Sequence, residues 1–390
     1  MKKKWLSRNL IVLTLVSLAQ DAASELLYPL LPYIVTAGVI GAAPLALGLI
    51  EGCAEAAAGF TKLYSGKKSD SLGRKPFVIA GYSIAGIGKA LVIFGTVWST
   101  IFLGRVTDRI GKGLRGAPRD ALIHDSVPNE HVGKAFGFHR TGDNIGAVIG
   151  PLIALAGLSL LNDDVRAVAK WALIPALLSG LLTLVVKETF VQRKVIEKTH
   201  EKVALPKALK KSIAILTFIQ FTNIPDALLL LRLYDLDFSV RGVVLTYALY
   251  SLVTVIFAFP GGYFADKFAP QIVYAVGLTA FAVAYVTLGL TSSKLIAVLA
   301  LVIYGIFPAL TDGVGKAWIA KLSDAPHRGR AQGVYQASMN FAVLGAGIWG
   351  GALWSKGENQ PVLVVAGLGA LAGAIFFGSR FLRESFANRR

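Results

Sequence analysis

Long apolar segments, separated by charged residues, glycine or proline, are the feature that most constrains this chain. Hydrophobic residues make up 54% of its 390 residues and charged residues only 16%. A run of about 20 apolar residues can cross a bilayer as a helix, and such runs recur from one end of the sequence to the other. The sequence therefore predicts an all-α membrane protein that crosses the bilayer many times.

We expect twelve transmembrane helices in two sets of six. The first set covers residues 9–36, 43–65, 76–97, 99–124, 133–160 and 165–186, and the second covers residues 211–233, 240–264, 270–290, 295–320, 329–354 and 361–382. The longest polar segment lies between the sets. We therefore expect an N-terminal six-helix bundle (1–187), a cytoplasmic linker (188–210) and a C-terminal six-helix bundle (211–390).

The first apolar segment has two interpretations. Its basic start and apolar run are typical of a cleaved signal peptide. The apolar pattern, however, continues past Asp21 and Glu25 to a length that suits a membrane span, and further spans follow. We therefore favour an uncleaved first helix.

The net charge of +17 indicates membrane topology rather than nucleic-acid binding. A nucleic-acid-binding protein gathers Lys and Arg on one soluble face, whereas here they occupy alternate short connections between apolar segments. The positive-inside rule then places both termini in the cytoplasm. We expect a multi-pass monomer in a prokaryotic inner membrane, with the lipid bilayer and a small-molecule substrate as partners and no nucleic acid.

The two halves resemble each other at a constant offset of 196 residues from the second helix to the fifth. Glycine, alanine, aspartate and asparagine recur at this offset: Gly66, Asp70, Gly133, Ala135, Gly137 and Asn144 correspond to Gly262, Asp266, Gly329, Ala331, Gly333 and Asn340. Parallel six-helix repeats are the plan of a secondary transporter, with a substrate site between the halves near the membrane midplane.

GKKSDSLGRK, residues 66–75, resembles the cytoplasmic loop motif GxxxDRxGRR of the major facilitator superfamily, with Ser71 in place of the usual first arginine. The resemblance extends over nearly the whole chain. It implies a fold of two pseudo-symmetric six-helix bundles. It also implies that a conformational latch between the halves includes Gly66, Asp70, Gly73 and Arg74.

GFHRTGDNIGAVIGP, on the fifth predicted helix, resembles the antiporter motif of the same superfamily. The matching positions are Gly137, Gly146, Gly150 and Pro151, and the chain then continues with LIA where the family usually has paired glycines. The resemblance implies an exporter similar to drug/proton antiporters. Independently, small residues along one helix face allow close helix contact, although glycine and alanine are also common in membrane helices. The strings DRIGKGLRGAPRDALI and FGFHRTGDNIGA resemble a poorly characterised bacterial and archaeal subgroup.

The stretch GRVTDRIGKGLRGAPRD, residues 104–120, places many charges on the fourth predicted helix. A phosphate-binding loop is excluded because Val106 and Gly113 stand where GxxxxGK[ST] needs glycine and Ser or Thr. If the helix reaches residue 124, its charges share one face: Arg105, Asp108, Arg109, Lys112, Arg115 and Arg119. Such a stripe must face water or partner charges, which predicts a hydrated cavity. The alternative is that Pro118 ends the helix and the later charges are cytoplasmic.

Acidic residues form two pairs with helical spacing in the first two spans. They are Asp21 with Glu25 and Glu51 with Glu55. Counting residues from the helix ends places them at a depth comparable with Arg105, whose position resembles the fourth-helix arginine that the superfamily associates with proton transfer. Clustered acids beside an arginine titrate as a coupled group. Asp21, Glu25, Glu51, Glu55 and Arg105 are therefore our hypothesis for proton coupling; the alternative is fixed salt bridges that only hold helices together.

Further polar residues in the spans are expected to line the substrate cavity. In the first half they are Tyr28, Asp108, Arg109, Lys112, Arg140, Asp143 and Asn144, with the fifth-helix residues able to pair with the fourth-helix stripe; in the second half they are Gln220, Asn223, Asp226, Gln336 and Asn340. The chain has one cysteine, Cys53, and its histidines form no ligand pattern. We therefore expect no metal site and no cofactor, with the proton gradient as the energy source.

These features favour a secondary active transporter that works by alternating access and exports a small organic compound in exchange for protons. Two alternatives stay open. One is proton-coupled uptake by symport, and the other is export of a metal ion or metal chelate, because carboxylates suit hard cations. A membrane-embedded enzyme is not expected, since the sequence contains neither HExxH nor GxSxG.

Overall fold

Helices are the only regular secondary structure in residues 5–188, 205–323 and 328–387, the parts of the chain that this computed structural model describes. By its internal contacts the chain divides into two compact units. One unit consists of Met1–Ala42 and Leu49–Glu201, and the other of Ala43–Gly48 and Lys202–Arg390. Most of the expected linker, residues 189–204, lies outside the described residues.

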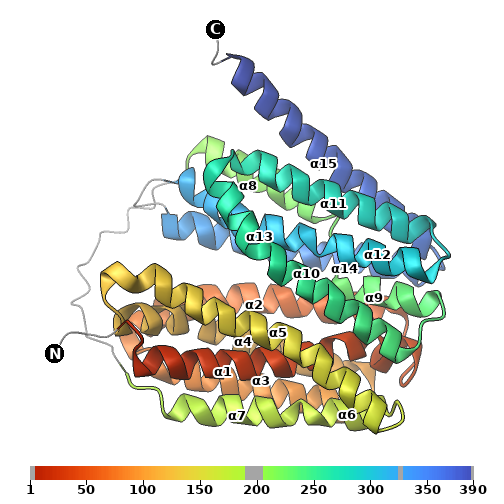
Figure 1. Ribbon diagram of the computed structural model, residues 1–390, viewed down its shortest axis with the longest axis horizontal. Helices are drawn as coiled ribbons and strands as arrows, with labels where there is room; N and C mark the ends of the chain where they lie inside the picture. Colours follow the sequence, from red (N-terminus) through yellow and green to blue (C-terminus); the bar gives the residue numbers. More distant parts are fainter. Residues whose placement is uncertain (1–4, 189–204, 324–327, 388–390) are drawn as a thin grey trace. The chain divides into compact units, whose positions relative to one another are not determined.

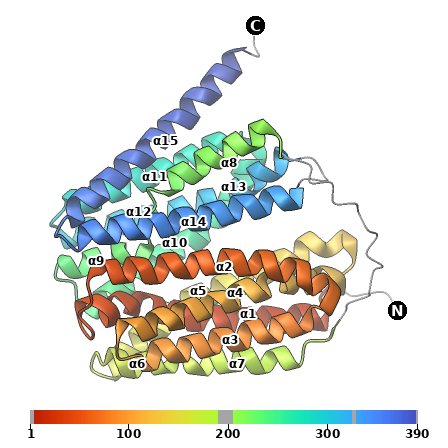
Figure 2. The same ribbon diagram turned by 180° about the vertical axis from the view of Figure 1, so that it is seen from behind.

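The first unit contains the helices α1 to α7, apart from the first residues of α2, which end at Gly48 (Figure 1). They are α1 (Arg8–Leu27) with the 3₁₀ turn η1 (Tyr28–Leu30) and the π-helical turn η2 (Tyr33–Ala37), α2 (Pro44–Leu72), α3 (Lys75–Phe94), α4 (Trp98–Ser126), η3 (Asn129–His131), α5 (Val132–Leu160), α6 (Val165–Trp171) and α7 (Leu173–Leu184). α3 packs along α4, and α1 packs against α5 and α7. The side formed by α2, α3 and α4 faces the reader in Figure 2.

The second unit contains the helices α8 to α15. They are α8 (Lys207–Gln220), α9 (Asp226–Asp235), α10 (Val240–Lys267), α11 (Pro270–Leu290), α12 (Lys294–Tyr304), α13 (Ile306–Lys321), α14 (Arg328–Trp354) and α15 (Asn359–Ala387). α11 packs against α13 and α15, and α14 packs against α8. The C-terminal end of α15 extends beyond the other helices of its unit in both views (Figures 1 and 2).

Within the described residues these helices make twelve spans, which confirms the expected all-α fold of two six-helix bundles. Three of these spans are each made of two helices, α6–α7, α8–α9 and α12–α13, and the first span passes from α1 into η1 and η2. Eight spans of the described residues are long and apolar enough to be identified by length and hydropathy alone. α2 and α4 are not among them, because charged side chains interrupt their apolar sequence. These two spans carry many of the residues expected to be functional.

The length of α4 decides between the two interpretations of its charged sequence. α4 runs to Ser126 with Pro118 inside it, so the interpretation in which Pro118 ends the helix is wrong. Proline removes one backbone donor but does not have to end a membrane helix when its surroundings satisfy the freed carbonyl. The charges from Arg105 to Arg119 therefore all lie on one continuous helix.

α2 is longer than expected and ends at Leu72 rather than near residue 65. Gly66 and Asp70 are consequently helical, and the expected cytoplasmic loop is reduced to the two residues between α2 and α3. The helix therefore continues through the polar residues that were expected to form a loop. The helix ends where Gly73 adopts a φ of +90°, a left-handed conformation that favours glycine.

The interruption between α8 and α9 has a counterpart in the first unit. The seventh span was expected to be continuous over 211–233, but it breaks between Gln220 and Asp226, where Pro225 cannot donate to the helical ladder. In the first unit the helix tightens to η1, which contains Pro29. Pro29 and Pro225 are separated by the same offset of 196 residues, so the two halves are interrupted at equivalent places. Interrupted helices are where secondary transporters commonly place their binding sites.

Candidate functional site

A bidentate ion pair joins α2 to α4 inside the first unit. Arg105 Nε donates to Glu51 Oε1 at 2.7 Å, and Arg105 Nη2 donates to Glu51 Oε2 at 2.7 Å. Only 5% of Arg105 and 3% of Glu51 is exposed. Two parallel hydrogen bonds fix the orientation of both side chains, and a buried pair of this kind cannot lose one member without leaving the other charge unpaired.

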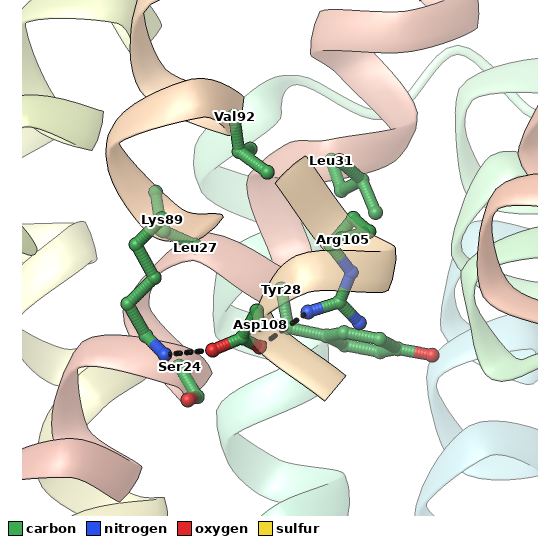
Figure 3. A pocket seen from close by; sticks show the side chains of 8 residues that line it. All are labelled: Ser24, Leu27, Tyr28, Leu31, Lys89, Val92, Arg105 and Asp108. Atoms are coloured by element: carbon green, nitrogen blue, oxygen red, sulfur yellow. Dashed lines mark hydrogen bonds and ion pairs between the residues drawn. The ribbon is translucent and has the colours of Figure 1, made fainter. Parts of the chain in front are cut away.

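A second buried ion pair joins α3 to α4. Lys89 Nζ donates to Asp108 Oδ1 at 2.5 Å, and Asp108 Oδ2 lies 3.6 Å from Arg105 Nη1. Figure 3 shows Lys89 and Arg105 pointing toward Asp108 from opposite sides. The two pairs therefore form one chain of alternating charge, Glu51–Arg105–Asp108–Lys89, which we call the buried charge chain.

Glycine allows the close helix contact that forms the Lys89–Asp108 pair. A Cβ atom added at Gly88 of α3 would lie 2.4 Å from the backbone nitrogen of Asp108, and one added at Gly104 would lie 2.7 Å from the Gly88 carbonyl oxygen. Larger side chains would separate α3 from α4. Lys89 was not among the residues predicted from the sequence, although a lone lysine inside the apolar third span is a signal of function or pairing.

Tyr28 and the buried charge chain share a pocket. The Arg105 guanidinium lies 5.5 Å from the centroid of the Tyr28 ring, within the range of a cation–π contact. The pocket is lined by Ser24, Leu27, Tyr28, Leu31, Lys89, Val92, Arg105 and Asp108 (Figure 3). It lies where α1 tightens into η1. The polar surface of this pocket thus comes from an interrupted helix and from the charge chain.

The remaining cations of the α4 stripe have different surroundings. Arg109 Nε lies 3.2 Å from Glu55 Oε1, so this charge is also paired with α2. Lys112 is exposed, while Arg115 is buried with its guanidinium 4.4 Å from the Tyr82 ring centroid. Arg109 and Arg115 therefore face a partner charge of α2 and an aromatic ring of α3, whereas Lys112 is exposed.

Asp21 lies at a different depth from Arg105, which corrects the expected pairing. Arg105 is level with Tyr28, seven residues further along the first span, or roughly 10 Å at the helical rise. The charged groups that act on Asp21 are instead Asp143 and the cations further along α4, namely Lys112, Arg115 and Arg119. The expected depth was wrong because Asp21 was counted from one end of its own 30-residue span, which is longer than the bilayer core, and Arg105 from the opposite end of a different helix.

Two glycines of the antiporter-like motif lie against the turns of α1 that carry acids. A Cβ atom added at Gly146 would lie 2.5 Å from the Leu18 carbonyl oxygen and 3.2 Å from Asp21 Cβ. One added at Gly150 would lie 2.6 Å from the Ala22 carbonyl oxygen and 2.9 Å from Glu25 Cβ. Pro151 is also buried, whereas Gly137 is exposed with open space around it. The motif therefore brings α5 close to Asp21 and Glu25.

Within the described residues the polar side chains of α5 form no close ion pair with the α4 stripe, although Asp143 acts electrostatically on Arg119. Arg140 is exposed and forms no ion pair with any residue of α4 in the described structure. Asp143 Oδ1 lies 3.7 Å from Nε2 of the buried His139, and Asn144 is half-buried. From α4, Arg119 donates to Ser17 of α1 at 2.8 Å.

The latch residues gather around the connection between α2 and α3. Arg74 Nη1 forms an ion pair with Asp125 near the end of α4 and donates to the Ala121 carbonyl oxygen at 3.0 Å. The backbone nitrogens of Arg74 and Lys75 donate to Glu188 Oε2 at 3.0 and 2.8 Å. Glu188 thereby attaches the start of the linker to the start of α3. The side chain of Asp70 lies outside the described residues.

In the second unit, Asn223 and Asp226 join a group of tyrosines that the sequence analysis did not select. Tyr304 donates to Asn223 Oδ1 at 3.0 Å and to Asp226 Oδ1 at 2.8 Å, and Tyr250 donates to Asp226 Oδ2 at 2.9 Å. The other expected cavity residues, Gln220, Gln336 and Asn340, are half-buried on α8 and α14. Among the described residues there is no group of three or more His, Cys, Asp or Glu side chains placed to hold a metal ion.

Comparisons with known sequences identify relatives along the whole chain. A family model described as Major Facilitator Superfamily matches residues 13–232 and residues 212–390. An uncharacterized MFS-type transporter of Methanocaldococcus jannaschii is 28% identical over 384 residues, covering 95% of this chain and 94% of that protein. The multidrug resistance protein MdtH of Klebsiella pneumoniae is 25% identical over 346 residues, covering 86% of this chain and 85% of that protein.

Solved structures share the fold at low sequence identity. The nucleoside transporter NupG matches with a TM-score of 0.75 and 16% identity, covering 96% of this chain and 99% of that chain. A D-xylose-proton symporter matches with a TM-score of 0.73 and 18% identity, covering 94% of this chain and 96% of that chain. These likenesses support the two-bundle arrangement of helices.

Proposed function

The chain belongs to the Major Facilitator Superfamily, and within that family of membrane transporters we propose that it exports a small organic compound in exchange for protons. We further propose that it works as a monomer in the cell membrane with both termini in the cytoplasm. The excess of Lys and Arg in alternate connections supports this orientation. The similarity to the multidrug resistance protein MdtH supports export.

The observation that carries the proposal is the contrast among the acids of the first bundle. Glu51, Glu55 and Asp108 are each paired with a cation of α3 or α4. Asp21 is half-buried and forms no ion pair or hydrogen bond with any residue in the described parts of the chain. A carboxylate that is not locked in an ion pair can take up and release a proton without breaking one. Asp21 is therefore our choice for the proton-carrying group.

The position of Asp21 links its charge to helix packing. It lies on α1 beside Gly146 of α5, where the two helices are in close contact. Adding or removing a charge at a buried helix contact changes the free energy of that contact. Protonation of Asp21 can therefore bias the packing of α1 against α5, which is the kind of two-state element that alternating access needs.

The other charges of the first bundle have a supporting role in this proposal. The buried charge chain holds α2, α3 and α4 together through two ion pairs with little exposed surface. Arg105 also presents its guanidinium to Tyr28 in the pocket beside η1. The buried charge chain thus forms a fixed charged surface, and α1 can move against this surface.

The test is transport by the purified protein in liposomes under an imposed pH gradient, with a panel of drugs, metal ions, sugars and siderophores. We expect at least one organic compound to move against the proton flow. Movement of compound and protons in the same direction would identify a symporter and reject export by antiport. A metal ion as the only transported species would reject the organic-compound proposal.

The role of Asp21 is tested by Asp21→Asn, with Glu130→Gln as the matched control. Glu130 is an exposed acid in the short connection before α5, so its loss should leave proton coupling intact. Asp21→Asn should abolish proton-driven transport while the protein stays folded. Proton-driven transport at the wild-type rate in Asp21→Asn would reject Asp21 as the proton carrier.

A further inference from the structure

Three titratable side chains follow one another along the contact of α1 with α5 in the first unit. They are Asp21 of α1 and Asp143 and His139 of α5. We propose that Asp143 and His139 pass protons between Asp21 and the cytoplasmic end of the first bundle. This inference rests on the proposed function, because it supplies a path for the proton that we assign to Asp21.

The close packing of α1 against α5 sets the order of these groups. A Cβ atom added at Gly146 of α5 would lie 3.2 Å from Asp21 Cβ, and one added at Gly142 would lie 2.4 Å from Thr14 Cγ2. Residue numbers therefore increase in the same direction along both helices. The two helices run parallel, and both begin at the end of the bundle that we place in the cytoplasm.

Asp143 is the middle member of the three groups. It lies one helical turn before Gly146, and it is the charged group that acts most strongly on Asp21. His139 lies four residues earlier on α5, on the same helix face as Asp143. The seven residues from His139 to Gly146 rise about 10 Å along α5. The three groups therefore lead from Asp21 toward the start of α5.

The Asp143–His139 pair is buried but is not closed by a hydrogen bond. Asp143 Oδ1 lies 3.7 Å from His139 Nε2, and neither atom has a hydrogen-bond partner among the described residues. Only 3% of His139 is exposed. Residues four apart on a helix are neighbours, so a small side-chain rotation brings the two atoms together. The carboxylate and the imidazole can then exchange a proton without breaking another hydrogen bond at these atoms.

The other ring nitrogen of His139 has a partner that suits either tautomer. His139 Nδ1 lies 3.4 Å from Thr14 Oγ1 of α1. A hydroxyl can donate or accept, so Nδ1 can be bare or can carry a hydrogen. When Asp21 releases its proton, its O–H bond breaks and an O–H bond forms on Asp143. That proton then passes to Nε2 of His139, and the imidazolium loses a proton to cytoplasmic water.

The charged groups around His139 leave this path open. The groups that act on it electrostatically come from α4 and α5, and they are Arg119, Asp120, Asp143 and Arg140. Arg119 donates to Asp120 Oδ1 at 3.0 and 3.1 Å, so its guanidinium is held on α4. Arg140 is exposed. Nε2 of His139 and Oδ1 of Asp143 are therefore available to each other.

The test follows the protonation of Asp21 in the purified full chain after a rapid drop in pH, by time-resolved infrared spectroscopy. The carboxylic acid band of Asp21 is identified as the band that is missing from Asp21→Asn. We expect His139→Gln to slow the rise of this band about tenfold or more, while its final size stays at the wild-type value. A slower rise with the same final size distinguishes a proton path from a contact that only holds the helices together. A wild-type rate in folded His139→Gln would overturn the inference.

Two further variants locate the path. His124→Gln is the matched control, because His124 is exposed on α4 and lies outside the path; it should keep the wild-type rate. Asp143→Asn removes the middle member and should slow the band by a similar factor. If His139→Gln does not fold, Asp143→Asn decides the matter in its place. Equal slowing by His124→Gln and His139→Gln would overturn the specific role of His139.

The same measurement separates this inference from the proposed function. If no band depends on Asp21, Asp21 is not the proton carrier, and its assigned role and the path are both rejected. If the band rises at the wild-type rate without His139, only the path is rejected. Symport in the liposome measurement would reject export and leave the path, because proton uptake by Asp21 is measured without any transported compound.

Discussion

The two bundles place different chemistry at equivalent positions. In the first bundle, Glu51, Lys89, Arg105 and Asp108 form the buried charge chain; at an offset of 196 residues the second bundle has Tyr247, Tyr285, Leu301 and Tyr304. Both groups of residues lie beside an interrupted first helix, at Pro29 and at Pro225. A repeated fold has therefore kept these positions and exchanged ion pairs for aromatic rings.

The exchange teaches how the two bundles can divide the work of one transporter. Buried ion pairs connect helices rigidly. A change of charge in such a pair raises the free energy of the protein, because an unpaired ion in a membrane is costly. Aromatic rings around one acid give a surface that tolerates ligands of different shapes. We therefore assign energy coupling to the first bundle and substrate recognition to the second.

The largest expected effect on stability comes from replacing one residue of the first bundle by the residue at the equivalent position of the second bundle. Arg105→Leu copies Leu301 and leaves Glu51 without its bidentate partner in a buried site. We expect this variant to lose about 3–5 kcal/mol of stability, measured by unfolding in detergent, and to lose transport. The double variant Glu51→Gln with Arg105→Leu should recover most of the stability. Wild-type stability of the single variant would contradict the role given to the pair.

The next effect concerns Lys89 and Asp108. Lys89→Met should cost about 3 kcal/mol, at the lower end of the range for a broken buried pair, because Arg105 remains 3.6 Å from Asp108. Combining it with Asp108→Leu removes both charges and should restore stability to within about 1 kcal/mol of the wild type in the same unfolding measurement. A double variant that is less stable than either single variant would show that the pair is not the source of the effect.

A smaller effect is expected at the contact of α1 with α5. Gly150→Ala introduces a methyl group 2.6 Å from the Ala22 carbonyl oxygen, so the helices must separate. We expect a loss of about 1–3 kcal/mol in stability and slower transport in liposomes. Gly137→Ala is the matched control, because it makes the same substitution in the same motif where there is open space. Equal effects of the two substitutions would contradict the packing role of the motif.

The smallest effect on stability is expected for a tyrosine of the second bundle. Tyr304→Phe removes one hydroxyl that donates to Asn223 and Asp226 but keeps the ring. We expect it to cost about 1 kcal/mol in the unfolding measurement, since hydrogen bonds from a neutral donor contribute less than a buried ion pair. A loss of stability equal to that of Lys89→Met would contradict the claim that this hydroxyl contributes less to stability than a buried ion pair of the first bundle.

The fold class and most span boundaries could be predicted from the sequence, because residues that cross the bilayer are mostly apolar and Lys and Arg gather in the connections between spans. The sequence did not predict which charges meet. Lys89 was missed because one residue in an apolar span gives no periodicity, and its contact with Asp108 depends on the glycines that bring α3 and α4 together. Asp21 was assigned to Arg105 because counting residues cannot give the tilt or the extra length of the first span.

The tyrosines of the second bundle were missed for a different reason. Tyr250 and Tyr304 are ordinary residues for a membrane helix, and no pattern within α10 or α12 distinguishes them. Only the fold brings them to Asp226 beside the interrupted helix. The polar residues Asn223 and Asp226 were selected from the sequence because amides and acids are rare in membrane spans.

We propose that a proton on Asp21 is exchanged for the exported compound. It is tested most directly by measuring, with a pH indicator in weakly buffered detergent solution, the protons released when the purified protein binds a compound that it transports. The wild type and Glu130→Gln should release protons on binding, and Asp21→Asn should bind the compound without releasing them. Equal proton release by Asp21→Asn and the wild type would contradict the claim.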